Sequence, residues 1–219
     1  MISIAPTEVV RQLDGSQLEL TDLPIRAATA EVRANKPLRL AQIEAMSAAE
    51  RGSLLSLCYD LFVRGWHEVS FGPCIEGAVF ELQLNAPPEK FSVLDGYLTV
   101  VFPPGPSHFH LCIGPTRGLG ADATPEALAA QRLCSRVAFT RSLSSTTCTP
   151  GSWGLRFWNG AGEQMLSVFL PSPFLDDRQR PQRDPDWSRL QLWDELRARY
   201  LGETEPQPLP VVPRRGAPP

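Results

Sequence analysis

The sequence lacks the features that mark a nucleic-acid-binding or a membrane-inserted protein. Its net charge is −3, Lys36 and Lys90 are its two lysines, and it has no long basic run to follow a phosphate backbone. It contains no stretch of eighteen consecutive apolar residues, and no basic segment followed by an apolar one opens it. We therefore expect a cytoplasmic protein with no membrane insertion and no nucleic-acid partner.

Cysteine is too scarce and too irregularly spaced to build a disulfide framework. The five cysteines are an odd number and include no Cys-x-x-Cys pair, so reduced thiols fit the sequence best. Arginine greatly outnumbers lysine, and alanine and proline are abundant. This composition is typical of a bacterial genome of high G+C content.

The chain does have enough apolar sequence for one core. It is 219 residues long and 42% hydrophobic, which favours one domain over two. We predict an N-terminal extension over residues 1–36 and a single domain over residues 37–202. Residues 203–219 are rich in proline and are predicted to form a disordered tail.

Several segments show the spacing of amphipathic helices. Ser47 and Glu50 form a capping-box pattern that opens one of them, and Gly65 and Gly202 are typical helix ends. Another segment begins at Thr124-Pro125 and carries an apolar stripe that runs on to Ala138. Helical spacing is also present after Pro37, at Leu40, Ile43 and Met46. The other predicted helices cover residues 47–65, 124–138 and 186–202, and the last of them follows a charged, proline-rich linker over residues 174–185.

Between residues 72 and 114 the period changes to that of strands. Asp95-Gly96 separates two apolar runs and predicts a two-residue hairpin, and the prolines of residues 103–106 predict another reversal. A further hairpin is predicted around residues 159–162. The sequence therefore predicts a single α+β domain with an antiparallel sheet of about five or six strands and helices packed on one face.

The most informative stretch is Ser-His-Phe-His-Leu-Cys-Ile-Gly, residues 107–114. Alternate side chains of a strand share a face, so His108, His110 and Cys112 would line one side together. Imidazole nitrogen and thiolate sulfur are ligands that zinc and iron favour, although the strand has to bend for all three to share an ion. We predict a Zn or non-haem Fe site here, in a protein that acts on a small molecule if it is an enzyme. The alternative is a structural strand with a core cysteine.

Further ligands and catalytic groups have to come from other segments. Cys148 and His67 lie in predicted loops and are preferred over Cys74 as the fourth ligand. Glu81 and Glu163 are the candidate general bases beside a metal-bound water, although each is also explained as an exposed strand carboxylate.

Other functions stay open on the sequence alone. The chain could be a non-catalytic accessory or assembly protein that contacts partners through its aromatic hairpin and its proline-rich tail. The aromatic residues from Trp153 to Phe174 could instead enclose a tetrapyrrole. A Cys112–His110 nucleophile pair is disfavoured, because side chains two apart on a strand are about 6–7 Å apart at their Cα atoms.

The string His108-Phe109-His110 is similar to the His-x-His strands of α-type carbonic anhydrases and of cupins. The first family needs a third histidine downstream, and no histidine follows His110. The second needs a glutamate where Gly114-Pro115-Thr116 stands. Neither family is therefore predicted.

Overall fold

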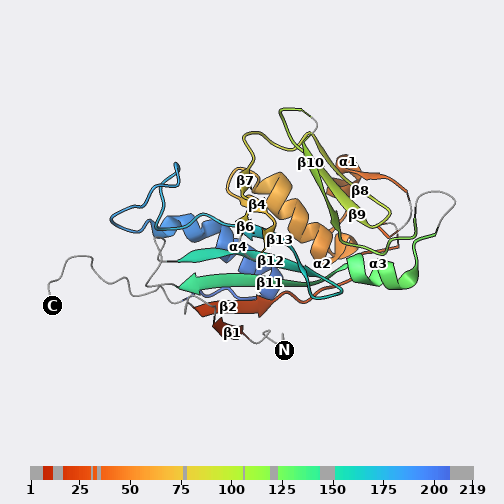
Figure 1. The fold of residues 1–219 in the computed structure, drawn as a ribbon. Helices are drawn as coiled ribbons and strands as arrows, with labels where there is room; N and C mark the ends of the chain where they lie inside the picture. The colour runs from red at the N-terminus through yellow and green to blue at the C-terminus, as the bar shows by residue number, and fades with distance from the viewer. Residues whose placement is uncertain are drawn as a thin grey trace.

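A buried helix lies between two antiparallel sheets, and this arrangement organises the fold (Figure 1). The computed structural model describes residues 7–11, 17–30, 32–33, 36–75, 78–105, 107–118, 123–143 and 151–207.

The strands form a larger and a smaller sheet. Within the described residues the larger sheet has seven strands in the order β1-β2-β11-β12-β13-β4-β7, and the smaller has four in the order β10-β9-β8-β3. The larger sheet comprises β1 Thr7–Arg11, β2 Gln17–Asp22, β4 Ser70–Gly72, β7 Leu82–Gln83, β11 Cys134–Leu143, β12 Ser152–Asn159 and β13 Gln164–Phe169. The smaller comprises β3 Leu38–Arg39, β8 Lys90–Leu94, β9 Tyr97–Val101 and β10 His108–Cys112. A separate pair is formed by β5 Cys74–Ile75 and β6 Ala78–Val79.

The helices are short, and most of them lie between or beside the sheets. They are α1 Leu40–Ala45, α2 Ala48–Tyr59, its π-helical continuation η1 Asp60–Arg64, α3 Glu126–Arg132, the 3₁₀ turn η2 Trp187–Leu190 and α4 Gln191–Leu201. In the part of the chain that the structure describes, no helix has the length and apolar character needed to cross a membrane.

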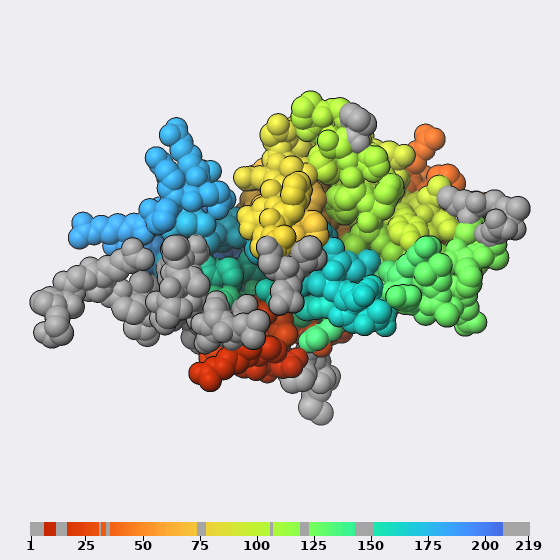
Figure 2. Space-filling model, in the orientation of Figure 1, coloured from red at the N-terminus to blue at the C-terminus, as the bar shows by residue number. Residues whose placement is uncertain are grey.

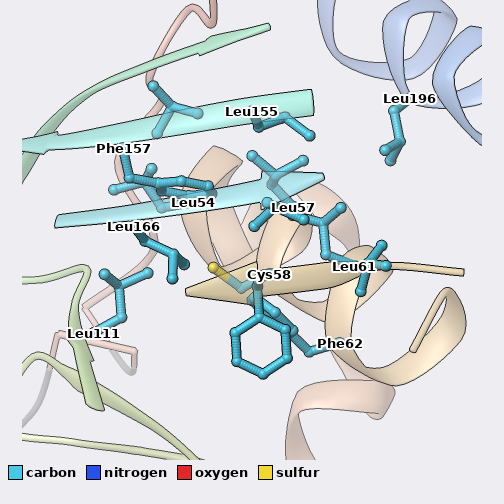
Figure 3. Close-up of a cluster of buried hydrophobic side chains, with 14 of the residues drawn as sticks. Leu54, Leu57, Cys58, Leu61, Phe62, Leu111, Leu155, Phe157, Leu166 and Leu196 are labelled. Carbon is cyan, nitrogen blue, oxygen red and sulfur yellow. The ribbon is translucent and has the colours of Figure 1, made fainter. Parts of the chain in front are cut away.

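Helix α2 is the centre of the core. The predicted capping box is confirmed, because Glu50 N donates to Ser47 Oγ at 3.3 Å and Ser47 N donates to the Glu50 carboxylate at 2.6 Å. Every residue from Gly52 to Cys58 is buried, so the helix has no solvent-facing side there. In Figure 3 the side chains of α2 and η1 lie between Leu155 of the larger sheet and Leu111 of the smaller.

The predicted Asp95-Gly96 hairpin is confirmed and joins β8 to β9. Both residues have positive φ, 47° and 76°, as a tight two-residue hairpin turn requires. The Asp95 carboxylate accepts hydrogen bonds from the backbone N–H groups of Arg117 and Gly118, at 2.7 and 3.0 Å. These bonds fix the segment that follows β10 against the turn.

The α+β class and the antiparallel pairing are confirmed, but the strands do not form one sheet of five or six. A single sheet would leave one side of α2 in water, whereas the smaller sheet covers that side with Phe91, Leu98 and Val100. The helices do share one face of the larger sheet, since Trp193 of α4 contacts Phe139 on the face that also packs against α2.

One local prediction was wrong. The helix expected to run on to Ala138 ends at Arg132, and residues from Cys134 form the long strand β11. In β11, Val137 and Phe139 point to one face and Ala138 to the other, and all three are buried. This alternation suits a strand that is covered by apolar residues on both faces. Residues 17–22 form β2, between β1 and β11, inside the segment expected to be an extension.

The final helix ends at Gly202 as predicted, and residues 208–219 of the proposed tail lie outside the described residues.

Candidate functional site

The predicted metal strand is β10, at the edge of the smaller sheet. His108 and His110 lie on its exposed face with their ring centroids 5.0 Å apart. His110 Nδ1 is 2.8 Å from the hydroxyl of Thr99, its cross-strand neighbour. Partial burial, together with the charges of His108 and Lys90, lowers the pKa of His110, so its imidazole is neutral near pH 7.

Cys112 follows the same alternation but lies in the interior. It is 2% exposed, and its thiol donates to the carbonyl of Gly114 at 3.5 Å. Burial raises the pKa of this thiol, which keeps it protonated, whereas a metal ligand must be a thiolate. Among the described residues, no group of three or more His, Cys, Asp or Glu side chains is arranged to hold a metal ion. Cys148 lies outside the described residues, so its role as a ligand stays a prediction.

Glu163 is in a turn, apart from the other predicted groups. It is exposed at the β12–β13 hairpin, where its carboxylate accepts a hydrogen bond from the Asn159 side-chain amide at 3.0 Å. Asn159 Oδ1 in turn accepts from the backbone N–H groups of Ala161 and Glu163. These bonds give Glu163 a structural part in the turn.

The structure brings His67 and Glu81 together in a pocket of about 600 Å³ at one end of the larger sheet. We call it the end pocket. The blue residues after β13 and the yellow residues around β4 and β7, which supply its walls, stand on either side of a notch in Figure 2.

The first wall begins where η1 ends at Gly65. The following loop places His67 and Glu68 at the pocket, with His67 Nε2 3.7 Å from the Glu68 carboxylate. Glu81 comes just before β7 and is exposed. Because Gln83 of β7 lies opposite Ser70 of β4, the Gln83 amide reaches the His67 carbonyl at 3.5 Å, and Glu81 lies two residues farther along, toward the other end of β4.

The floor is formed by the ends of three paired strands. Phe169 of β13 lies opposite Ser70 of β4, and Ser70 lies opposite Gln83 of β7, so all three occupy one face of the sheet. Trp153 lies behind this floor, 2% exposed and stacked on Phe174 with ring centroids 6.1 Å apart. An ordered apolar layer therefore supports the polar lining.

The second wall is the segment after β13, which reads in the sequence as a charged linker. Gln182 donates through its amide to the carbonyls of Leu175 and Pro173, at 2.8 and 3.3 Å. Asp176 accepts from the backbone N–H and the guanidinium of Arg180, both at 2.9 Å. The buried Phe174 anchors the segment between Trp153 and Trp187. These contacts give the wall a defined shape.

Arg189 of η2 completes this wall. Its guanidinium donates to the Asp177 carboxylate at 2.6 Å, and the two side chains are 19% and 94% exposed respectively. The Arg189 Nε–H is buried and has no hydrogen-bond partner in the described structure. Asp177 therefore neutralises Arg189 without satisfying all of its donors.

Sequence reasoning missed Asp177 and Arg189 as pocket residues, and it considered Phe169 only among the aromatic residues that could enclose a tetrapyrrole. The capping residue Asp186 correctly marked the helix start near Arg189, and its carboxylate does accept from Ser188 N at 3.1 Å. No local pattern indicates that residues 171–189 fold back to face His67. That meeting depends on β4 pairing with β13, a contact between distant segments.

The comparisons with known proteins give a family but no activity. The model of a family of unknown function, DUF7676, matches residues 30–202, so the chain belongs to that family. No curated protein and no solved structure matches the chain. The match includes every residue that we have placed at the end pocket.

Proposed function

We propose that this member of the DUF7676 family binds a small organic molecule in the end pocket. The observation that carries the proposal is the pocket itself, whose volume of about 600 Å³ lies in the range typical of ligand sites. Its floor places Phe169 beside Ser70 and Gln83 over the buried Trp153, and further polar groups converge from two walls, a mixture that is usual in such sites.

The way the walls are held supports ligand binding over a chance surface depression. The floor is built on paired strands, and Phe174 anchors the second wall against Trp153 and Trp187. A site whose shape is fixed before binding loses less conformational entropy when a ligand enters. His67 and Glu81 supply a donor and acceptors at the opening.

A cytoplasmic location and the absence of a nucleic-acid partner form part of this proposal. The first rests on the lack of a long apolar run, and the second on the net charge of −3 and the lack of basic runs. A small-molecule ligand, with or without a chemical step, is consistent with both.

The test is a ligand-detected NMR screen of a fragment library of small amines, acids and neutral aromatics. We expect hits whose signals are lost when Gln83→Trp fills the pocket from the exposed strand β7. The matched control is Ser107→Trp, an exposed position before β10 that does not line the pocket. Hits that survive in both variants, or no hits at all, would contradict the proposal.

A metal-binding function is the second candidate, favoured by the adjacent His108 and His110 imidazoles on β10. Because His110 bonds Thr99 through Nδ1, it would have to bind Zn or Fe through Nε2. Elemental analysis of untagged protein by plasma mass spectrometry tests this candidate. Near-stoichiometric metal that disappears in the His108→Ala/His110→Ala double variant would support it, and metal-free protein after reconstitution would exclude it.

A further inference from the structure

The charges around the end pocket are unevenly distributed. The first wall carries two carboxylates, Glu68, which lies 3.7 Å from His67, and Glu81, which lies toward the other end of β4. The second wall carries Arg189, whose charge is balanced by Asp177 at 2.6 Å. Arg189 is the one arginine of the lining, and no lysine is present in the described lining. The pocket as a whole is therefore acidic, with the excess negative charge on the first wall.

No cation of the described structure balances Glu81. Its carboxylate forms no ion pair there, and the nearest charged contact on that wall is between His67 and Glu68. A ligand group that neutralises Glu81 would be attracted more strongly in the pocket than at an open surface, because the floor beside it has a lower dielectric constant than water.

The floor suits the same kind of group. Phe169, Ser70 and Gln83 lie side by side across three paired strands. An aromatic ring therefore borders the acidic wall. The face of an aromatic ring attracts cations, and the ring also contacts the apolar part of a ligand. Carboxylates beside an aromatic ring are a common environment for ammonium groups.

We propose that the ligand of the end pocket is an organic cation, an amine whose ammonium group binds Glu81 while its apolar part contacts Phe169. This inference rests on the proposed function, because it names the chemical class of the ligand of the same pocket. The Asp177–Arg189 pair borders the opposite wall and leaves that side without net charge.

The experiment compares three probes that share one ring and differ in charge: benzylamine, benzyl alcohol and benzoate. Each is titrated into the full-length protein, and the dissociation constant is followed by protein-observed NMR. We expect benzylamine to bind at least about tenfold more tightly than benzyl alcohol, the effect of one charged hydrogen-bonded contact. Added salt should weaken the amine and leave the alcohol unchanged.

Two variants then test whether Glu81 supplies the negative charge that attracts the amine. Glu81→Gln keeps the shape of the side chain and should weaken benzylamine about tenfold without changing benzyl alcohol. Glu163→Gln is the matched control, because Glu163 is also exposed but lies in the β12–β13 turn outside the pocket. It should change neither probe, and the melting temperatures of both variants show whether they fold.

The outcomes separate this inference from the proposed function. Equal binding of the three probes, or tighter binding of benzoate, would overturn the organic-cation assignment and leave the pocket as a ligand site. Benzylamine binding that is equally weakened by Glu163→Gln would also overturn it. If no probe binds at millimolar concentration and the fragment screen is empty, both proposals fail.

Discussion

The three histidines lie in two regions whose surroundings differ. His67 lines a pocket together with two glutamates and a floor of Phe169, Ser70 and Gln83, whereas His108 and His110 are on the exposed face of an edge strand with a threonine as neighbour. The sequence gives more weight to the second region, because two histidines and a cysteine are close together there. In the structure, distant segments meet at the first region. Closeness in sequence is therefore a weaker guide to a site than convergence in space.

The largest expected effect contrasts the two faces of β10. Phe109 points inward, with its ring centroid 5.1 Å from those of Phe62 and Phe71, while His108 points to solvent. Phe109→Ala should lower the free energy of unfolding by about 3 kcal/mol. His108→Ala should change it by less than about 0.5 kcal/mol, as is usual for exposed positions. Urea denaturation measures both, and comparable losses would contradict the described orientation.

The second prediction concerns Asp60, a buried carboxylate that links η1, the element before the first wall of the end pocket, to α4, the helix after the second wall. Asp60 begins η1, which leads to His67, and it accepts from the Tyr200 hydroxyl at 2.6 Å and the Arg199 guanidinium at 2.5 Å, both in α4. Helix α4 follows directly on η2, which carries Arg189.

Asp60→Ala should therefore destabilise the protein by about 2 kcal/mol, because it removes a buried acceptor shared by the half-buried Tyr200 hydroxyl and the exposed Arg199 guanidinium. Tyr200→Phe removes one hydrogen bond and should cost about 1 kcal/mol. Thermal denaturation gives both values. Hydrogen exchange should be faster in α4 and the histidine loop and unchanged in β9. Faster exchange confined to the smaller sheet would show that Asp60 does not join the walls.

The third prediction adds charge to each region in turn. Gln83→Glu puts another carboxylate on the floor, next to the acidic wall, and should tighten benzylamine binding about threefold at low salt. Thr99→Glu adds the same charge beside His110 on the smaller sheet and should leave benzylamine unchanged. Titration by NMR compares the two variants. An equal gain in both would mean that net charge, and not the pocket, attracts the amine.

The smallest effect is a pH dependence at the edge strand. The unfolded chain titrates His110 near 6.5, and in the folded protein partial burial, His108 and Lys90 lower its pKa. Between the lowered pKa of the folded state and 6.5, the unfolded state binds more protons than the folded state. The protein therefore loses stability as the pH falls below 6.5. The loss should stay below about 0.5 kcal/mol, because the side chain is largely exposed and screened.

His110→Asn should make the pH profile of the free energy of unfolding flatter between about pH 8 and about pH 5, where histidine titrates. Chemical denaturation across this range measures the profile. The same profile in the variant and in the unaltered protein would show that His110 does not contribute.

Local features of the fold were predictable from the sequence. The capping box at Ser47 and Glu50, the Asp95-Gly96 hairpin and the helix end at Gly202 each depend on residues within a few positions of one another. They were predicted correctly because backbone conformation and nearby hydrogen bonds decide them.

The errors have a common cause. Residues 124–138 have apolar spacing that fits a helix, but from Cys134 onward they pair with β2 and β12 as a strand, and both partners are distant in sequence. Residues 174–185 read as a linker because of their prolines and charges, yet Phe174 and Gln182 secure them against the core. Tertiary contacts of this kind outweigh local propensity.

The sequence by itself determined the α+β class, the capped helices, the tight turns and the alternation of β10, since each follows from short-range sterics and periodicity. Only the tertiary structure decided that Cys112 is buried as a thiol and that Glu163 belongs to a turn. It also decided that His67 and Glu81 face Arg189 across a pocket. These outcomes depend on which strands pair and which faces are covered, and the free energy of burial and of non-local hydrogen bonds sets that choice only when the whole chain has folded.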